Sequence, residues 1–228
     1  MGDTKQLLRA AQLFSDLGED ELDAIARLAS VRKVMARDVI VRQGDPGGEL
    51  FVIAEGHLKV VSPHPGGRET ALNIMGPGEV FGEVTLIDGA PRSATIVSLD
   101  DGELVSIRRE PFLGFLSESP KTTVRLLQVL AGRLRRLTER TEDIAFLRVS
   151  GRLARRVLKL GEEYGRRLAD GSTLITVKLS QQEIGDLVGA TRESTNKMLR
   201  VWEEDGLISQ QSGHLVVHDM KELAERAR

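Results

Sequence analysis

The chain has 228 residues, enough for one or two domains that each bury a core of their own. Hydrophobic residues make up 40% and charged residues 29% of the sequence, which is typical of a globular protein and not of a disordered one. The absence of cysteine excludes disulfides, thiolate metal sites and iron–sulfur clusters. No stretch approaches the roughly 18 apolar residues of a membrane helix, and the N-terminus lacks the apolar segment of a signal peptide, so we expect a cytoplasmic protein without a membrane partner.

The first half of the chain changes from a helical to a β-rich pattern. Apolar residues recur at helical spacing through the first thirty residues, up to Ala29. From Val34 to about Ile107, short β-prone runs alternate with glycine, proline and aspartate, which predicts an antiparallel sandwich or barrel. Within this region, the residues that follow Gly82 predict a turn and a short helix.

A long helix is expected over residues 121–146, directly after Pro120, because proline is tolerated in a first helical turn. One stripe of this helix follows alternating steps of three and four residues, the a/d spacing of a coiled coil. The stripe consists of Leu127, Leu130, Leu134, Leu137, Thr141 and Ile144. This spacing predicts a homodimer interface, and the alternative is a helix that packs only on its own β-rich domain.

A domain boundary is expected at residues 147–151, LRVSG, where the helical pattern is interrupted, so that the domains are 1–147 and 148–228. The second domain has 14 Lys and Arg against 12 Asp and Glu, a net charge of +2 within a chain of net −2. This small asymmetry does not by itself identify a nucleic-acid partner. The sequence of the second domain predicts a helix, a strand, two helices around a tight turn, two strands joined at 211–213 and a last short helix. Up to the pair of strands, this is the order of a winged helix-turn-helix.

The two helices around the turn have recognisable boundary signals. Ser180 and Glu183 have the spacing of a capping box, in which the hydroxyl and the carboxylate each satisfy a free backbone amide. Gly189 supplies the tight turn, and Thr191 is a good N-cap for the second helix. These signals predict that the second helix starts with a polar, exposed segment.

The start of the second helix carries residue types suited to reading DNA in the major groove. The residues expected to contact DNA are Thr191, Arg192, Glu193, Asn196 and Lys197. Arg192 can donate twice to guanine, Glu193 can accept from cytosine, and Lys197 lies one turn further on. The alternative is that Glu193 and Lys197 form only a surface ion pair at i,i+4 spacing.

The segment FGEVTLIDGAPRSAT in the β-rich domain offers the parts of an anion site. Gly82 allows a ligand to approach the backbone closely, and Arg92 presents a planar fork to phosphate oxygens. Ser93 adds a hydroxyl and Ala94 a backbone amide, whereas the carboxylate of Glu83 suits a sugar hydroxyl. Together these residues predict a site that holds a sugar phosphate at both ends. The alternative is an internal salt bridge between Glu83 and Arg92.

Two blocks of sequence carry a family resemblance. The first contains QGDPGGELFVIAEGHLKVV and FGEVTLIDGAPRSATIV, and the second contains AFLRVSGRLAR and LSQQEIGDLVGATRESTNKMLRVWEEDGLI. With the long helix between them, they resemble the cyclic-AMP receptor protein (CRP/FNR) family of bacterial transcription regulators over nearly the whole chain. The resemblance implies an α+β fold with an N-terminal cyclic-nucleotide-binding β-roll, a long dimerisation helix and a C-terminal winged helix-turn-helix domain.

The resemblance also implies that cyclic AMP is an allosteric effector and that the protein has no catalytic cofactor. The implied cyclic-AMP site consists of Gly82, Glu83, Arg92, Ser93, Ala94 and Thr138. Glu83 would hold the ribose hydroxyl, and Arg92 the cyclic phosphate. Where the family has two adjacent hydroxyl residues for the adenine amino group, this chain has Leu137, which departs from the pattern, and Thr138, which keeps a hydroxyl.

The implied partners are double-stranded DNA with palindromic half-sites similar to TGTGA, a second copy of the chain, and RNA polymerase, for which the turn at 169–173 is a candidate contact. The absence of cysteine excludes the oxygen-sensing branch of the family, and neither His57 nor His64 suggests haem ligation, so no metal is expected. The sequence holds no HExxH, GxSxG, Walker or Rossmann motif, which argues against an enzyme. The alternative function is a regulator of this family that binds DNA constitutively or answers another ligand.

Overall fold

The computed structural model describes residues 2–64 and 69–227. Contacts divide the chain into two compact units, one formed by Met1–Glu69 with Asn73–Arg135 and the other by Thr70–Leu72 with Arg136–Arg228. This division falls inside the long helix, ahead of the boundary that the sequence predicts. Within the described residues, no helix is both long and apolar enough to cross a membrane.

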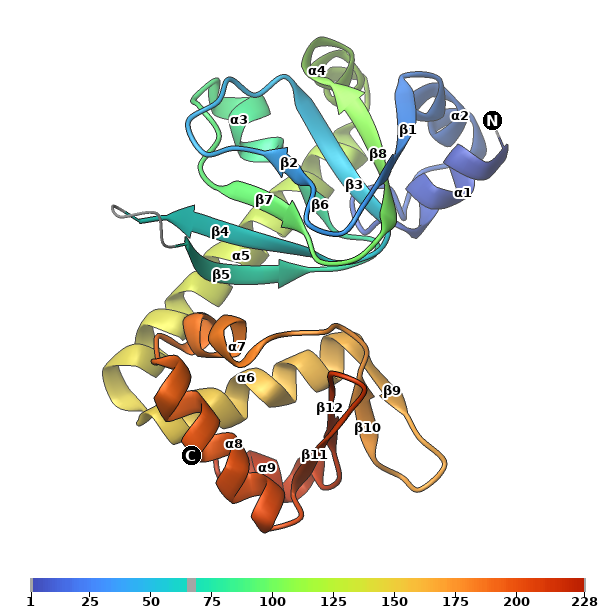
Figure 1. Ribbon diagram of the computed structural model, residues 1–228. Coiled ribbons are helices and arrows are strands. Elements are labelled where there is room, and N and C mark those ends of the chain that lie inside the picture. The colour runs from blue at the N-terminus through green and yellow to red at the C-terminus, as the bar shows by residue number, and fades with distance from the viewer. Residues whose placement is uncertain (1, 65–68, 228) are drawn as a thin grey trace. The chain divides into compact units, whose positions relative to one another are not determined.

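The first unit is built on two four-stranded antiparallel sheets (Figure 1). One sheet has the strand order β1 (Ala29–Val34), β8 (Gly102–Arg108), β3 (Glu49–Glu55) and β6 (Val80–Phe81). The other has the order β2 (Val39–Val41), β7 (Thr95–Ser98), β4 (Leu58–Pro63) and β5 (Glu69–Met75). Successive side chains of β3 point to opposite sides of the sheet, and both sides are covered by a hydrophobic core. Leu50 and Val52 pack into a core with the N-terminal helices, whereas Phe51 and Ile53 pack into a second core with residues of both sheets.

The helices of this unit confirm most of the predicted pattern. They are α1 (Gly2–Ala10), α2 (Glu19–Arg27), α3 (Glu83–Asp88), α4 (Arg109–Glu118) and the first part of α5 (Pro120–Phe146), whose residues from Arg136 onward belong to the second unit. Pro120 starts α5 as expected. The helical prediction is wrong at Ala29, which opens strand β1 and pairs with Ile107 of β8. The reason is tertiary, because pairing along β8 satisfies the backbone of this segment in a way that its periodicity does not reveal.

The second unit is a winged helix-turn-helix, as the sequence predicts. Its elements after α5 are α6 (Val149–Tyr164), β9 (Gly165–Arg167), β10 (Thr173–Ile175), α7 (Gln181–Val188), α8 (Arg192–Glu204), β11 (Ile208–Gln211), β12 (His214–Val217) and α9 (Met220–Glu225). The strands form one antiparallel sheet in the order β11-β12-β10-β9. Trp202 of α8 and Leu153 and Val157 of α6 are fully buried and form part of the core.

The turn between α7 and α8 has the local chemistry that its sequence predicts. The hydroxyl of Ser180 accepts from the amide of Glu183 at 3.2 Å, while the Glu183 carboxylate accepts from the amide of Ser180 at 2.9 Å. Gly189 has a φ of 65°, a left-handed conformation that glycine adopts without strain. Thr191 caps α8 by accepting from the amide of Ser194 at 3.1 Å. A Cβ at Gly185 would lie 2.8 Å from Oγ1 of Thr195, so this glycine allows α7 and α8 to pack closely.

Removing the capping hydroxyl at the start of α7 is expected to weaken the winged helix measurably. Ser180→Ala should lower the free energy of unfolding by about 1 kcal/mol, because a backbone amide loses its acceptor. The measurement is urea unfolding of the full chain, followed by circular dichroism. Glu204→Ala, an exposed substitution on α8, is the control and should stay within about 0.5 kcal/mol of the parent. Equal values for the two variants would contradict a stabilising role of this cap.

Candidate nucleotide site and nucleic-acid interface

Two glycines shape the candidate nucleotide site of the first unit. Gly82, directly before α3, has a φ of 87°, and a Cβ there would lie 2.4 Å from Nη1 of Arg92 and 2.7 Å from the carbonyl oxygen of Glu49. A Cβ at Gly47 would lie 2.2 Å from Cγ2 of Thr85 and 2.9 Å from Nε of Arg92. The backbone therefore encloses the Arg92 side chain so closely that neither glycine can be enlarged without a shift of its neighbours.

Backbone carbonyl groups and an aromatic ring hold the Arg92 side chain in place. We call this enclosure, formed by Gly47, Glu49, Phe51 and Gly82, the cradle. It is only 7% exposed. Its Nη2 donates to the carbonyl oxygen of Glu49 at 2.8 Å and its Nη1 to that of Gly82 at 3.3 Å, and its guanidinium lies 5.7 Å from the ring centroid of Phe51. Burial lowers the pKa of Arg92 below its usual value, while the carboxylates of Glu49 and Glu83 oppose that shift. An arginine stays protonated under such conditions, so the cradle presents a fixed positive charge.

Glu83, the first residue of α3, is completely buried. One carboxylate oxygen forms an ion pair with Arg133 of α5, whose guanidinium also donates to the carbonyl oxygen of Val80. The other oxygen, Oε2, is buried and has no hydrogen-bond partner. A buried carboxylate oxygen without a donor is costly and accepts a hydroxyl readily. The alternative of a salt bridge between Glu83 and Arg92 is wrong, because the ionic partner of Glu83 is Arg133.

The remaining predicted ligand residues are Ser93, Ala94 and Thr138. Ser93 is exposed and Ala94 half-buried, and both directly follow Arg92. Thr138 is exposed on α5 and belongs to the other compact unit, so its part in the site stays a prediction. The structure thus brings together Gly82, Glu83 and Arg92. The sequence analysis does not identify Arg133, because α5 carries several arginines and the sequence does not show which of them pairs with Glu83.

The start of α8 presents most of the residues expected to contact DNA. Thr191, Arg192, Glu193 and Lys197 are all exposed. No ion pair joins Glu193 to Lys197 in the part of the chain that the structure describes, so the surface-pair alternative is not supported. Asn196 differs from the others, because its side-chain oxygen is buried and has no hydrogen-bond partner. Its expected contact with DNA stays a prediction.

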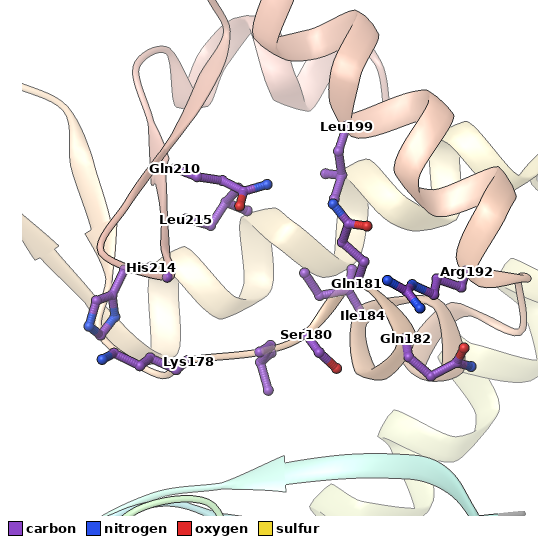
Figure 2. A pocket seen from close by; sticks show the side chains of 12 residues that line it. Lys178, Ser180, Gln181, Gln182, Ile184, Arg192, Leu199, Gln210, His214 and Leu215 are labelled. Atoms are coloured by element: carbon purple, nitrogen blue, oxygen red, sulfur yellow. The ribbon is translucent and has the colours of Figure 1, made fainter.

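A groove of about 690 Å³ lies between α7, the start of α8 and the wing (Figure 2). Figure 2 shows Lys178 and His214 at one end and Gln182 and Arg192 at the other. Nδ1 of His214 lies 3.1 Å from the carbonyl oxygen of Ile175, which fixes the imidazole ring. None of the residues that line the groove carries a carboxylate. The groove therefore offers cations and neutral donors, which suits an anionic strand.

Sequence reasoning missed the contribution of the wing and of the segment before α7 to this groove. Lys178, Gln210 and His214 come from separate segments that meet only when β12 pairs with both β10 and β11. Gln181 and Gln182 open α7 beside the Ser180 cap. The predicted hairpin at 211–213 could have indicated these residues. A wing beside the helix pair brings the residues that flank the hairpin to the same face as the helices.

Comparison with known domain families assigns both parts of the chain. A family described as "Cyclic nucleotide-binding domain" matches residues 31–119, and one described as "Crp-like helix-turn-helix domain" matches residues 151–226. The two domains make this chain a DNA-binding transcription regulator that carries a cyclic nucleotide-binding domain, and not an enzyme.

Individual relatives match over almost the entire chain. A CRP-like cAMP-activated global transcriptional regulator of Mycobacterium tuberculosis is 32% identical over 98% of this chain and 99% of its own length. The cyclic AMP receptor protein of Thermus thermophilus is 30% identical, covering 96% of this chain and 98% of its own. The chain belongs to the CRP/FNR family of transcription regulators.

Solved structures agree on the fold. The catabolite activator protein of Thermus thermophilus is 30% identical over 95% of this chain and 98% of its own, with a TM-score of 0.54. The c-di-GMP responsive global regulator CLP of Xanthomonas campestris is 24% identical over 89% of this chain and 100% of its own, with a TM-score of 0.76, and shows the shared fold alone.

Proposed function

We propose that the chain is a homodimeric regulator that binds cyclic AMP in the β-roll and then engages palindromic DNA with half-sites similar to TGTGA. The observation that carries the ligand assignment is the pair of opposite charges in one cradle. Glu83 is fully buried with a carboxylate oxygen that lacks a donor, and Arg92 is buried beside it. A ligand with a hydroxyl group and a phosphate group complements both residues.

In this proposal the groups of the cradle divide the ligand between them. Oε2 of Glu83 accepts from a ribose hydroxyl, which satisfies the buried acceptor. Arg92, the Ser93 hydroxyl and the amide of Ala94 donate to the cyclic phosphate. Thr138 hydrogen-bonds the adenine amino group. Because the neighbouring position holds Leu137, only one side-chain hydroxyl per protomer is offered to the base, so adenine selectivity depends on Thr138.

The dimer provides the route from ligand to DNA. The ion pair of Glu83 with Arg133 joins the proposed ribose contact directly to α5, the helix whose exposed leucine stripe we take as the dimer interface. A ligand that binds one arrangement of this helix more tightly shifts the population toward that arrangement. The favoured arrangement would place two recognition helices about 34 Å apart, one turn of DNA. The coupling must be reciprocal, so DNA should tighten ligand binding equally.

DNA recognition is assigned to α8 and the adjacent groove. Arg192 donates to a guanine and Glu193 accepts from a cytosine, with Lys197 in the same groove of the DNA. Thr191 and Asn196 complete the contact set. Lys178 and His214, which line the groove in Figure 2, are assigned to contact the phosphates of the bound strand.

The proposal also includes the functional domain boundary. This boundary lies between 147 and 148, where α5 has ended and α6 begins.

RNA polymerase is the expected protein partner, with the turn at 169–173 between β9 and β10 as its candidate contact. Residues 169–171 of this turn are exposed, whereas Ser172 and Thr173 are buried. Asp170 stabilises the turn by accepting from the amide of Ser172 at 2.9 Å. A protein that binds promoters acts where the chromosome lies, so we place it in the cytoplasm.

A second candidate function is constitutive DNA binding or a response to another ligand. Leu137 favours it, because it removes one of the two hydroxyl positions that the family uses for adenine. The regulator CLP, which responds to c-di-GMP, has the same fold, so the fold alone does not select cyclic AMP.

The test is fluorescence anisotropy of a labelled palindrome with TGTGA-like half-sites, titrated with protein at fixed salt, without nucleotide, with cyclic AMP and with cyclic GMP. Salt is fixed because phosphate contacts dominate the affinity. The proposal expects cyclic AMP to tighten binding about tenfold or more, a coupling of about 1.4 kcal/mol, and cyclic GMP to act more weakly. Equal affinity in all three conditions would support the constitutive alternative, and no binding to the palindrome would refute the DNA assignment.

Arg192→Ala is expected to relax specificity at one guanine of each half-site. The loss should be about 1–3 kcal/mol on the parent palindrome and much smaller on a palindrome in which that guanine is replaced. The measurement is the same titration with a panel of single-base variants. Arg226→Ala, which removes an equal charge bonded to Asp205 and Glu222, is the control. An equal loss on every DNA would mean that Arg192 contacts phosphate instead.

A further inference from the structure

Arg152 connects three backbone carbonyl groups that belong to different parts of the winged-helix unit. It lies in the first turn of α6 and is half-buried. Its Nη1 donates to the carbonyl oxygen of Leu147 at 3.0 Å, its Nε to that of Val188 at 2.8 Å, and its Nη2 approaches that of Gly189 at 3.5 Å. One guanidinium thus joins the residue after α5 to the end of α7.

These carbonyl groups are the ones that a helix leaves without internal partners. The last carbonyls of a helix have no amide ahead of them, and a cation at that end is favourable. Gly189 is the left-handed C-cap of α7, only two residues before Thr191, the N-cap of α8. The Gly189 carbonyl therefore belongs to the turn directly before α8. Arginine suits this position because its donors are fixed in one plane, whereas a lysine ammonium cannot reach several carbonyls in the same geometry.

Two pairs of oppositely charged residues connect the end of α5 to α6. Arg155 of α6 forms an ion pair with Asp143 of α5, and Lys159 lies 3.9 Å from Glu139. The amide of Leu147 donates to the carbonyl oxygen of Asp143 at 3.0 Å, so Leu147 continues from α5 without a break. The end of α5 is thus bonded to α6 and, through Arg152, to the turn that precedes α8.

We propose that Arg152 is a positioning residue for DNA recognition, which fixes the turn of the helix-turn-helix to the end of the dimerisation helix and transmits changes of that helix to α8. The proposal rests on the proposed function, since it assumes that α8 reads DNA. It assigns to Arg152 no contact with DNA or nucleotide. Its loss should therefore reduce sequence discrimination, while the general attraction of the domain for DNA and the affinity for nucleotide persist.

The experiment compares Arg152→Gln, Arg152→Lys and the parent, with Arg226→Gln as a control that removes one charge from side-chain carboxylate partners of the same unit. Affinities are measured for the palindrome and for a scrambled duplex, each with and without cyclic AMP. Amide hydrogen exchange of residues 189–195 is measured without DNA or nucleotide. Thermal unfolding shows that every variant is folded at the temperature used.

For Arg152→Gln we expect the ratio of palindrome to scrambled affinity to fall about tenfold, the loss of about 1.4 kcal/mol of discrimination. Affinity for scrambled DNA should match that of Arg226→Gln, and exchange at 189–195 should be faster by about tenfold because the turn opens more often. The tightening by cyclic AMP should also shrink. Arg152→Lys should show the same loss of discrimination as Arg152→Gln, because the planar guanidinium group, and not its charge alone, joins the carbonyl groups.

A discrimination ratio equal to that of Arg226→Gln would overturn the proposal, even if Arg152→Gln melts earlier, since Arg152 would then only cap α7. A normal ratio in Arg152→Lys would overturn the role of the planar guanidinium group. If the parent itself does not discriminate between the two DNAs, the proposed function fails, and hydrogen exchange then decides the positioning role alone. Unchanged exchange at 189–195 would reject it.

Discussion

Arg92→Ala is expected to weaken cyclic AMP binding about hundredfold or more, and to abolish the effect of cyclic AMP on DNA affinity, while DNA binding without nucleotide persists. The size follows from the environment of the side chain. Arg92 is the buried cation of the cradle, held by carbonyl oxygens of Glu49 and Gly82 in a fixed direction. A phosphate that loses such a charge-assisted, pre-oriented donor must be desolvated without compensation. The measurement is isothermal titration calorimetry of protein with cyclic AMP.

The structure offers a matched control for this variant on the same aromatic ring. Arg32 places its guanidinium 5.1 Å from the ring centroid of Phe51, as Arg92 does at 5.7 Å. Arg32→Ala therefore removes an equal charge and a similar cation–π contact without touching Glu83, and its nucleotide affinity should stay within about twofold of the parent. Thermal unfolding separates loss of binding from loss of fold. Unchanged nucleotide affinity in folded Arg92→Ala would refute the assignment of the phosphate site.

The sequence predicts the elements well where a boundary is encoded by adjacent residues. Pro120 starts α5, Ser180 and Glu183 start α7, and Gly189 ends it, because caps and turns depend on side chains within a few positions. The prediction is wrong at Ala29, where the strand is defined by pairing with Ile107, far away in the sequence. Local periodicity has no access to that partner.

The candidate site was predictable as a set of residue types but not as a network. Gly82, Glu83 and Arg92 lie within one short segment, so their chemistry could be deduced together. The ionic partner of Glu83 could not, because Arg133 is fifty residues away on a helix with several arginines that look equivalent in sequence. Which of these arginines faces α3 depends on the orientation of α5 about its own axis. The burial of Thr122 and Leu126 fixes that orientation.

The same limit applies to the winged-helix unit, where the proposed role of Arg152 depends on backbone groups. The carbonyls that Arg152 joins carry no sequence signature, since every residue has one. Arg152, Arg155 and Arg156 read as one basic cluster, yet the first binds backbone, the second is exposed and the third is buried. Tertiary structure thus gives different environments to three residues that look alike in the sequence.

Leu134→Glu is expected to convert the proposed dimer to a monomer at micromolar concentration and to remove most of the affinity for the palindrome. Leu134 is 66% exposed in the single chain, and Leu127, Leu137 and Ile144 of the same stripe are each about 60% exposed. In a symmetric dimer the substitution acts twice, and each lost leucine contributes about 1.5–3 kcal/mol of burial. The dissociation constant of the dimer should therefore rise about hundredfold to ten-thousandfold, as measured by analytical ultracentrifugation.

The consequence for DNA follows from geometry and not from any direct contact. A dimer holds its second recognition helix beside the second half-site, so that contact forms at a high effective concentration that a monomer lacks. Because the Leu134 side chain is exposed, its replacement should change the stability of the single chain by no more than about 0.5 kcal/mol. Gln128→Glu puts the same carboxylate on an exposed position of α5 outside the stripe and should remain dimeric. If Leu134→Glu also remains dimeric and binds the palindrome normally, the stripe is not the interface, and the two recognition helices must be held together by another surface.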